Sequence, residues 1–130
     1  MNVNIETRLF RWALPALFLV LATTATAVQA GKTLSGDEIR TLISGKTVYV
    51  TQYGNGSRWR AYFSADGSAS LSDSFKQEAW HIDEQGQHCT TGFPLFCAPI
   101  QDNGDGTYSR MKSDGGIASV WTKIVVGKDF

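Results

Sequence analysis

The sequence predicts an all-β domain with one short N-terminal helix, built as an antiparallel meander of about eight strands that forms a curved sheet or a small barrel. All thirteen glycines lie in residues 31–130, mostly in clusters with Asn, Asp or a second Gly that are typical of tight turns. Short runs rich in β-branched and aromatic residues separate these clusters. The expected strands are 46–53, 57–64, 68–73, 78–83, 87–91, 95–101, 107–112 and 117–126.

The first thirty residues have the pattern of a secretory signal peptide. Arg8 and Arg11 precede an uncharged, largely apolar run over 12–30 that ends in small residues. The strongly apolar part is shorter than the ~20 residues that cross a bilayer, so we expect cleavage of 1–30 and no stable membrane insertion afterwards. The sequence therefore predicts a periplasmic or secreted protein with a single β domain over 31–130.

The one expected helix covers 36–44 and has a clear N-terminal signal. Ser35 followed by Glu38 is a capping box, and the apolar residues Leu34 and Ile39 flank it as a hydrophobic staple. The helix leads directly into the first long strand.

The next hairpin, over 57–73, allows a prediction of register. A three-residue loop with a left-handed glycine pairs Ala61 with Leu71. The same loop pairs Phe63 with Ala69, so all four side chains share the inner face.

Charge and motifs exclude several functions. Residues 31–130 contain ten Lys or Arg and eleven Asp or Glu, a formal net charge of −1, without a block of like charge. Nothing in this pattern indicates binding to nucleic acid. The chain also lacks the Gly-x-Ser-x-Gly and His-Glu-x-x-His motifs, so we expect a protein that is not an enzyme and uses no cofactor.

The two cysteines, Cys89 and Cys97, are interpreted as a structural disulfide, because an exported protein meets an oxidising compartment. Their spacing is not the Cys-x-x-Cys of redox proteins. The closed loop should stabilise the fold by about 2.5 kcal/mol.

The hairpin over 78–91 is expected to divide its side chains between two faces. One face should carry Trp80, Ile82 and Cys89, and the other His81, Asp83 and His88. Two imidazoles and a carboxylate on one face are a conceivable metal site, but no fourth ligand is evident. We therefore interpret them as solvated side chains and expect no metal.

Candidate contact residues come from the surplus of aromatic and basic side chains. The last strand is apolar on both faces, so Trp121 either lies under the helix or forms an exposed patch with Arg58, Arg60 and Tyr62. The loop over 90–96 contributes Phe93 and Phe96, which either present a contact surface or fold back on the core.

Several motifs together carry a resemblance across the whole of residues 31–130. They are Leu34-Ser35-Gly36-Asp37-Glu38, Trp59 to Phe63 before Asp66-Gly67, Trp80-x-Ile82, Cys89 with Cys97, and Asp105-Gly106-x-Tyr108. In these the chain resembles a group of small exported proteins of Gram-negative bacteria. The resemblance implies a lipocalin-like β domain without an assigned activity. The chain differs from the group at Ala98, where an aromatic residue would follow the second cysteine.

Two hypotheses of function follow. The first is a non-enzymatic binding module of the cell envelope that holds a small apolar or amphipathic ligand in or across its sheet. The alternative is a protein-interaction domain, such as an inhibitor of a lytic enzyme or protease, that presents the loop 90–96 to an envelope protein.

Overall fold

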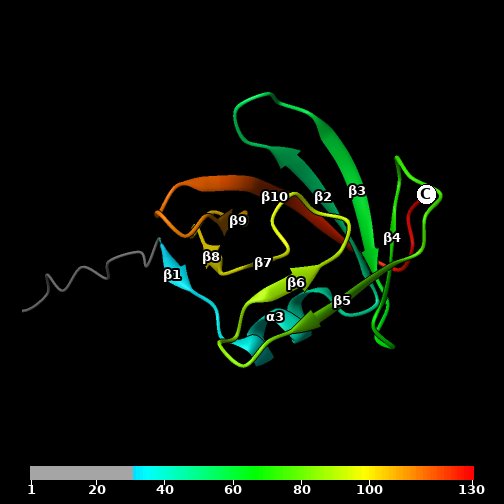
Figure 1. Ribbon diagram of the computed structural model, residues 1–130, viewed down its shortest axis with the longest axis horizontal. Coiled ribbons are helices and arrows are strands. Elements are labelled where there is room, and N and C mark those ends of the chain that lie inside the picture. Colours follow the sequence, from blue (N-terminus) through cyan, green and yellow to red (C-terminus); the bar gives the residue numbers. More distant parts are fainter. Residues whose placement is uncertain (1–30) are drawn as a thin grey trace, which may run out of the picture.

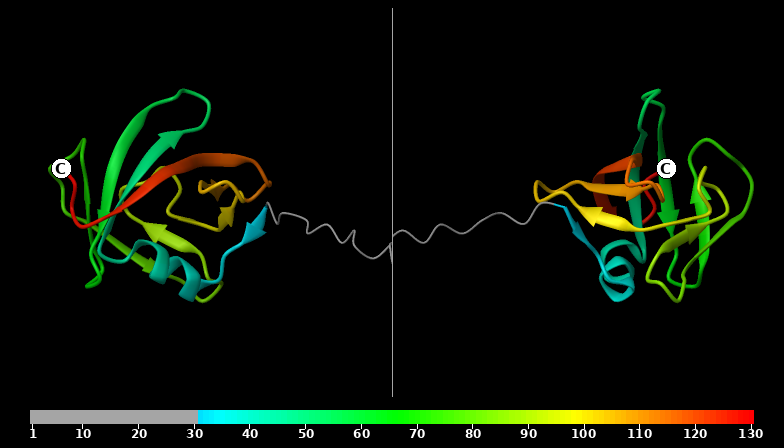
Figure 2. Two further views of the ribbon diagram at one scale, coloured as in Figure 1. Left: turned by 180° about the vertical axis from the view of Figure 1, so that it is seen from behind. Right: turned by 60° about the vertical axis from the view of Figure 1, so that its left-hand side comes forward.

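Residues 31–130, which the computed structural model describes, form ten antiparallel strands in one curled sheet and a single helix (Figure 1). The elements are β1 (Lys32–Thr33), α3 (Gly36–Ile43), β2 (Lys46–Gln52), β3 (Arg58–Phe63), β4 (Ser68–Leu71), β5 (Glu78–Ile82), β6 (His88–Thr90), β7 (Cys97–Ala98), β8 (Ile100–Asp102), β9 (Tyr108–Met111) and β10 (Ile117–Val126). The strand order is β1-β8-β9-β10-β2-β3-β4-β5-β6-β7, and the sheet curls into a half-barrel (Figure 2). The predicted fold class is confirmed, whereas the predicted signal peptide over 1–30 lies outside the described residues.

The helix α3 is capped as the sequence predicts. The Ser35 hydroxyl accepts a hydrogen bond of 3.1 Å from the backbone N–H of Glu38, whose carboxylate accepts one of 2.8 Å from the N–H of Ser35. These two bonds satisfy donors that a helix start otherwise leaves free. Ile39 and Ile43 are fully buried, so packing holds this short helix on the core.

The strands β2, β3 and β4 form two consecutive hairpins. The register of the second, between β3 and β4, agrees with the prediction. Ala61 lies opposite Leu71, and Phe63 lies opposite Ala69. Gly67, in the left-handed region at φ 96°, allows the turn between β3 and β4. All four paired side chains are buried, so the apolar match that fixed this register also fills the core.

The register of β5 with β6 differs by one residue from the predicted one. A three-residue loop over 84–86 closes this hairpin. His88 consequently lies opposite Ile82, and Cys89 opposite His81. The prediction that His88 shares a face with His81 and Asp83, and Cys89 one with Ile82, is wrong, because a shift of one residue moves every side chain of a strand to the other face.

The long strand β10 contains a β-bulge that explains its apolar residues on both faces. The pairing with β2 shifts between Trp121 and Lys123, so Thr122 is an extra residue. Trp121 is fully buried before the bulge, and Ile124 contacts the core after it. The inward set therefore changes from odd to even positions within one strand.

The expected strand over 95–101 is interrupted at Pro99, which has no N–H to donate to a ladder. β7 pairs with β6 at one edge of the sheet, whereas β8 pairs with β9 near the opposite edge. One residue thus connects the two sides, and the curl of the sheet brings them together.

The inside of the half-barrel is filled by side chains from nearly every strand and from α3. Its largest fully buried members include Trp121, Phe63, Ile39, Ile43, Ile100 and, as polar exceptions, Arg110 and His88.

Candidate ligand-binding groove

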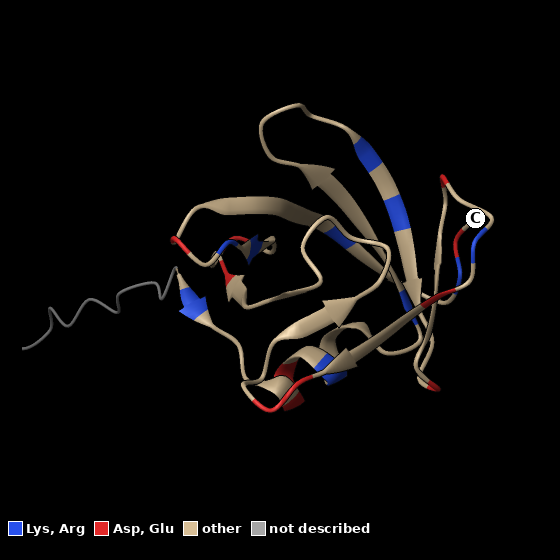
Figure 3. Cartoon of the chain, viewed as in Figure 1, with Lys and Arg blue, Asp and Glu red and all other residues tan. Residues whose placement is uncertain are grey.

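The predicted contact residues of β3 lie together on the outer face of the sheet. Arg58 is paired with Thr51 of β2, and Arg60 with Tyr49. Tyr62 follows on the same face and is half-buried. Figure 3 shows the two basic positions as separate blue bands along β3. The alternation of β3 therefore delivers both guanidinium groups to one surface.

The other predicted contact residues lie elsewhere. Trp121 is 0% exposed inside the half-barrel, with its ring centroid 6.4 Å from that of Phe63. Phe93 is 6% exposed and contacts Trp59 edge to face at 5.8 Å. Phe96 is 55% exposed. Of the two phenylalanines in the loop, only Phe96 presents its ring to the surface.

A groove of about 460 Å³ opens on the outer face between β10, β2 and β3. Its lining residues are Tyr49, Val50, Thr51, Arg58, Trp59, Arg60, Ser72 and Thr122. Such a lining offers guanidinium donors, hydroxyl groups and an aromatic ring. This is a set that binds an anion beside an apolar group, because guanidinium forks match the geometry of carboxylate and phosphate.

Tyr49 is the central aromatic residue of the groove. The guanidinium carbon of Arg60 lies 5.8 Å from its ring centroid, and the ammonium of Lys123 lies 5.1 Å from it. Both distances are within the range of a cation–π contact. Among residues 31–130, Arg58 has no ion-pair partner, so its charge is open to a ligand.

One acidic residue, Asp129, lies against this basic surface. The Tyr49 hydroxyl donates a hydrogen bond to the Asp129 carboxylate, and that bond raises the pKa of Tyr49. Nη1 of Arg60 donates to the backbone carbonyl of Asp129 at 2.6 Å and lies 4.0 Å from its carboxylate. The segment that follows β10 therefore returns over the outer face of β2 and β3.

A second groove, of about 420 Å³, separates α3 from the β8–β9 hairpin. Leu34, Leu42 and Tyr108 are its apolar lining, and burial raises the pKa of Tyr108. Two of its three acidic residues form ion pairs within the chain: Glu38 binds Lys32 at 2.9 Å and Asp37 binds Arg40 at 2.8 Å. The third, Asp102, accepts a hydrogen bond of 2.8 Å from the backbone N–H of Gly104. This groove offers less free charge to a ligand than the one on β3.

The three residues of the conceivable metal site do not converge. His88 is buried inside the half-barrel, whereas His81 is exposed on the other face of the hairpin. Asp83 instead lies beside the sulfurs of Cys89 and Cys97. Those sulfurs are joined in the predicted disulfide, which leaves no thiolate for a metal.

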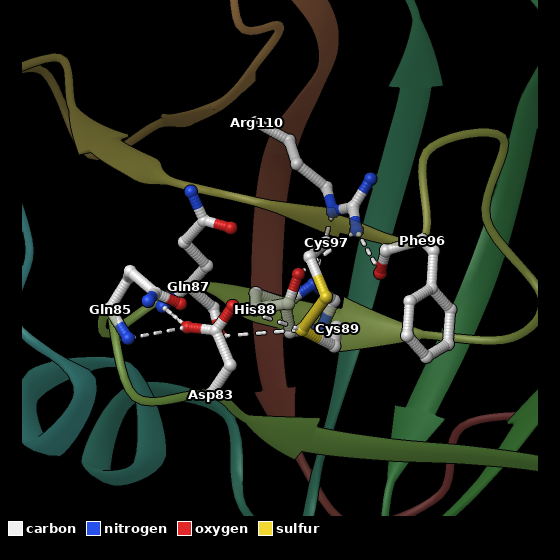
Figure 4. The surroundings of a disulfide bond; sticks show 8 residues. All are labelled: Asp83, Gln85, Gln87, His88, Cys89, Phe96, Cys97 and Arg110. Atoms are coloured by element: carbon white, nitrogen blue, oxygen red, sulfur yellow. Dashed lines mark hydrogen bonds between the residues drawn. A yellow bond between two sulfur atoms is a disulfide. The ribbon is translucent and has the colours of Figure 1, made fainter.

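A buried polar pair lies next to this disulfide (Figure 4). Nε of Arg110 donates to Nδ1 of His88 at 3.1 Å, and Nη2 donates to the carbonyls of His88 and Phe96 at 3.0 and 3.2 Å. Burial lowers the pKa of Arg110 to about 10 and holds that of His88 well below its usual value. The pair joins β9 to β6 and so closes the gap between the two sides of the sheet.

Sequence reasoning missed part of the groove. Tyr49 could have been placed by extending the register of β2 and β3, which puts it opposite Arg60. Thr122 could not, because the bulge that turns it outward follows from pairing over a long sequence separation. Nothing in the pattern of 127–130 indicated that this segment folds back.

Comparison with protein-family models, with curated proteins and with solved structures finds no match for this chain. Within residues 31–130, no helix combines the length and the apolar character that a membrane crossing requires. The fold and the site together define a small disulfide-closed β half-barrel with a basic groove on its outer face.

Proposed function

We propose that this chain is an exported, non-enzymatic binding module of the cell envelope, and that its ligand is a small anionic amphipath bound in the outer groove. The proposal depends mainly on one observation. Arg58 and Arg60 lie on the same face of β3 and both line the groove, and Arg58 lacks an ion-pair partner among the described residues.

The geometry supports a ligand with an acidic head and an apolar body. The two arginines are two residues apart on one strand, a separation of about 7 Å, so both can contact one phosphate or carboxylate head. The Tyr49 ring provides apolar surface in the same groove. A ligand inside the half-barrel is less favoured, because Phe63, Phe93 and Trp121 fill that space.

Titration with decyl phosphate, followed by tryptophan fluorescence, tests the proposal. Trp59 lies between Arg58 and Arg60 on β3, on the opposite face of the strand, and should report the bound probe through the strand. We expect saturable binding that weakens at least tenfold in the double variant R58Q/R60Q. Decyltrimethylammonium, with the same chain and the opposite charge, should bind no better to the native protein than to the variant.

The matched control is Arg40→Gln, which removes an exposed arginine of α3 outside the groove. It should bind decyl phosphate like the native protein. Equal binding by the native protein and R58Q/R60Q would contradict the proposal. Native mass spectrometry of the protein isolated from its own host would then identify the natural ligand from the mass of any adduct.

Phe96 supports a second candidate, the protein-interaction domain that presents the loop 90–96. Its ring is 55% exposed, and its carbonyl is held by Arg110, so an apolar side chain stands on a fixed backbone. The test is inhibition of a purified lysozyme and a purified serine protease. This function requires inhibition that Phe96→Ser abolishes, and full enzyme activity in both assays would reject these targets.

A further inference from the structure

The chain itself contacts one end of the outer groove, at Tyr49 and Arg60. Gly127 is in the left-handed region, at φ 84°, and turns the chain back after β10. The Thr47 hydroxyl donates to the carbonyl of Gly127 at 2.6 Å and accepts from the N–H of Asp129 at 2.9 Å. Residues 127–130, which we call the return segment, thus lie along the outer face beside Tyr49.

The return segment presents an acidic and an aromatic side chain to the same arginine. The carboxylate of Asp129 accepts from the Tyr49 hydroxyl, and its backbone carbonyl accepts from Arg60. The Phe130 ring centroid lies 5.5 Å from the guanidinium carbon of Arg60. The contacts within the chain therefore show that this end of the groove binds a carboxylate, a main-chain carbonyl and an aromatic ring.

These contacts are open to exchange. Asp129 and Phe130 are both exposed, and the ion pair of Asp129 with Arg60 has 45% and 39% of its side chains in solvent. Exposed ion pairs contribute little to stability. The side chains of Asp129 and Phe130 can therefore leave Arg60 without loss of core packing, whereas the buried Thr47 hydroxyl holds the backbone of Gly127 and Asp129.

The return segment leaves the second arginine unused. Arg58 lies two residues from Arg60 on the same face and has no ion-pair partner within residues 31–130. An extended segment that follows the groove from Arg60 to Arg58 would bring a second carboxylate to Arg58 two residues beyond the first, because side chains of a strand recur on one face every second residue.

From these contacts we infer that the groove recognises an extended acid–aromatic–acid segment of a partner protein, and that residues 127–130 compete with it from within the chain. The inference rests on the proposed function, since it uses the same anion-binding groove, and it names a peptide segment as a further ligand of that groove. One carboxylate binds Arg60 and Tyr49, the aromatic ring replaces Phe130, and the second carboxylate binds Arg58. In this mode of recognition the arginines of the groove bind both the carboxylates and the main-chain carbonyls of the partner segment.

The test uses a short probe peptide, acetyl-Gly-Asp-Phe-Asp-Gly-amide, titrated into the full chain by isothermal calorimetry. The double variant D129N/F130A should bind it about five- to tenfold more tightly than the native protein, because the apparent affinity equals the intrinsic affinity multiplied by the fraction of molecules in which the site is open. The control Asp37→Asn, an exposed aspartate of α3, should leave the affinity unchanged.

Further controls separate the parts of the inference. The peptide with both aspartates replaced by asparagine should bind at least tenfold more weakly, and R58Q/R60Q should lose binding of the acidic peptide. Unchanged affinity of D129N/F130A would overturn the competition. Equal affinity for the aspartate and the asparagine peptide would overturn the inference that the partner segment is acidic. Binding of decyl phosphate without binding of the peptide would overturn this inference while the proposed function stands, and binding of neither probe would overturn both.

Discussion

Arg110 of β9 donates a hydrogen bond of 3.1 Å from Nε to Nδ1 of His88 on β6, and both side chains are buried inside the half-barrel. Because Nδ1 accepts, the neutral imidazole carries its proton on Nε2. Nε2 is buried and has no hydrogen-bond partner among the described residues. The rings of Phe63 and Trp121 lie edge to face with the imidazole at 5.0 and 5.1 Å. One charged side chain is thus hydrogen-bonded within a largely apolar interior.

Replacing Arg110 with methionine should destabilise the protein by about 2–4 kcal/mol. The variant keeps most of the side-chain volume but leaves Nδ1 of His88 without its donor and takes one donor from the carbonyls of His88 and Phe96, of which the latter keeps the N–H of Thr90. A buried unsatisfied group costs about 1–3 kcal/mol. Urea unfolding of Arg110→Met measures this. The exposed counterpart Arg40→Met should change the free energy of unfolding by less than about 0.5 kcal/mol. If Arg110→Met were as stable as the native protein, the hydrogen bonds of Arg110 would not contribute to holding β9 against β6.

Stability should decrease as the pH falls from 7 to 5, because of His88. Burial lowers its folded pKa well below 6.5, whereas the unfolded chain takes up a proton near pH 6.5. The unfolded state therefore binds more protons throughout this window, and the free energy of unfolding falls by up to about 1.4 kcal/mol per pH unit. Urea midpoints between pH 7.5 and 5 give the slope, which should flatten in His88→Gln. An equal slope in both proteins would assign it to other groups.

The two phenylalanines of the loop should respond differently to substitution. Phe93 is buried against Trp59, so Phe93→Ser should cost about 3–5 kcal/mol and lower the melting temperature by many degrees. Phe96 is exposed, so Phe96→Ser should leave the melting temperature within a few degrees of the native value. Thermal unfolding of the two variants side by side provides an internal control. Similar melting temperatures would mean that the loop does not pack as described.

Loss of the disulfide should destabilise the half-barrel without unfolding it. Cys89 and Cys97 lie directly opposite each other on β6 and β7, with 3.9 Å between their Cα atoms. The double variant C89A/C97A should lose about 2.5 kcal/mol of unfolding free energy in the chain-entropy model. Denaturant unfolding of the native protein with and without a reductant should give the same difference. A loss below about 0.5 kcal/mol would show that β7 is held by other contacts.

The sequence predicted those elements whose signals are local. The capping box of Ser35 and Glu38 and the pairing of Phe63 with Ala69 both depend on residues close in the chain, and both are confirmed. The predicted register of β5 with β6 is wrong because the sequence of this loop fits either two or three residues. A difference of one residue decides which face of the hairpin His88 occupies. Local pattern fixes an element more reliably than it fixes a register.

The remaining features arise from contacts between distant segments. The burial of Arg110 could not be foreseen, because a charged residue in a strand is usually solvated and its acceptors belong to β6 and the following loop. The bulge at Thr122 and the return of Asp129 to Tyr49 likewise follow from pairing between β10 and β2. Of the residues that line the groove, the sequence analysis named only Arg58 and Arg60 as candidate contact residues.

The two edge strands of the described sheet, β1 and β7, are each only two residues long. A long free edge offers a row of unpaired N–H and C=O groups on which another chain can add a strand. β1 also carries Lys32, and β7 is followed at once by Pro99, and both residue types discourage such addition. The shortness of these edges should protect the protein from edge-to-edge aggregation at high local concentration.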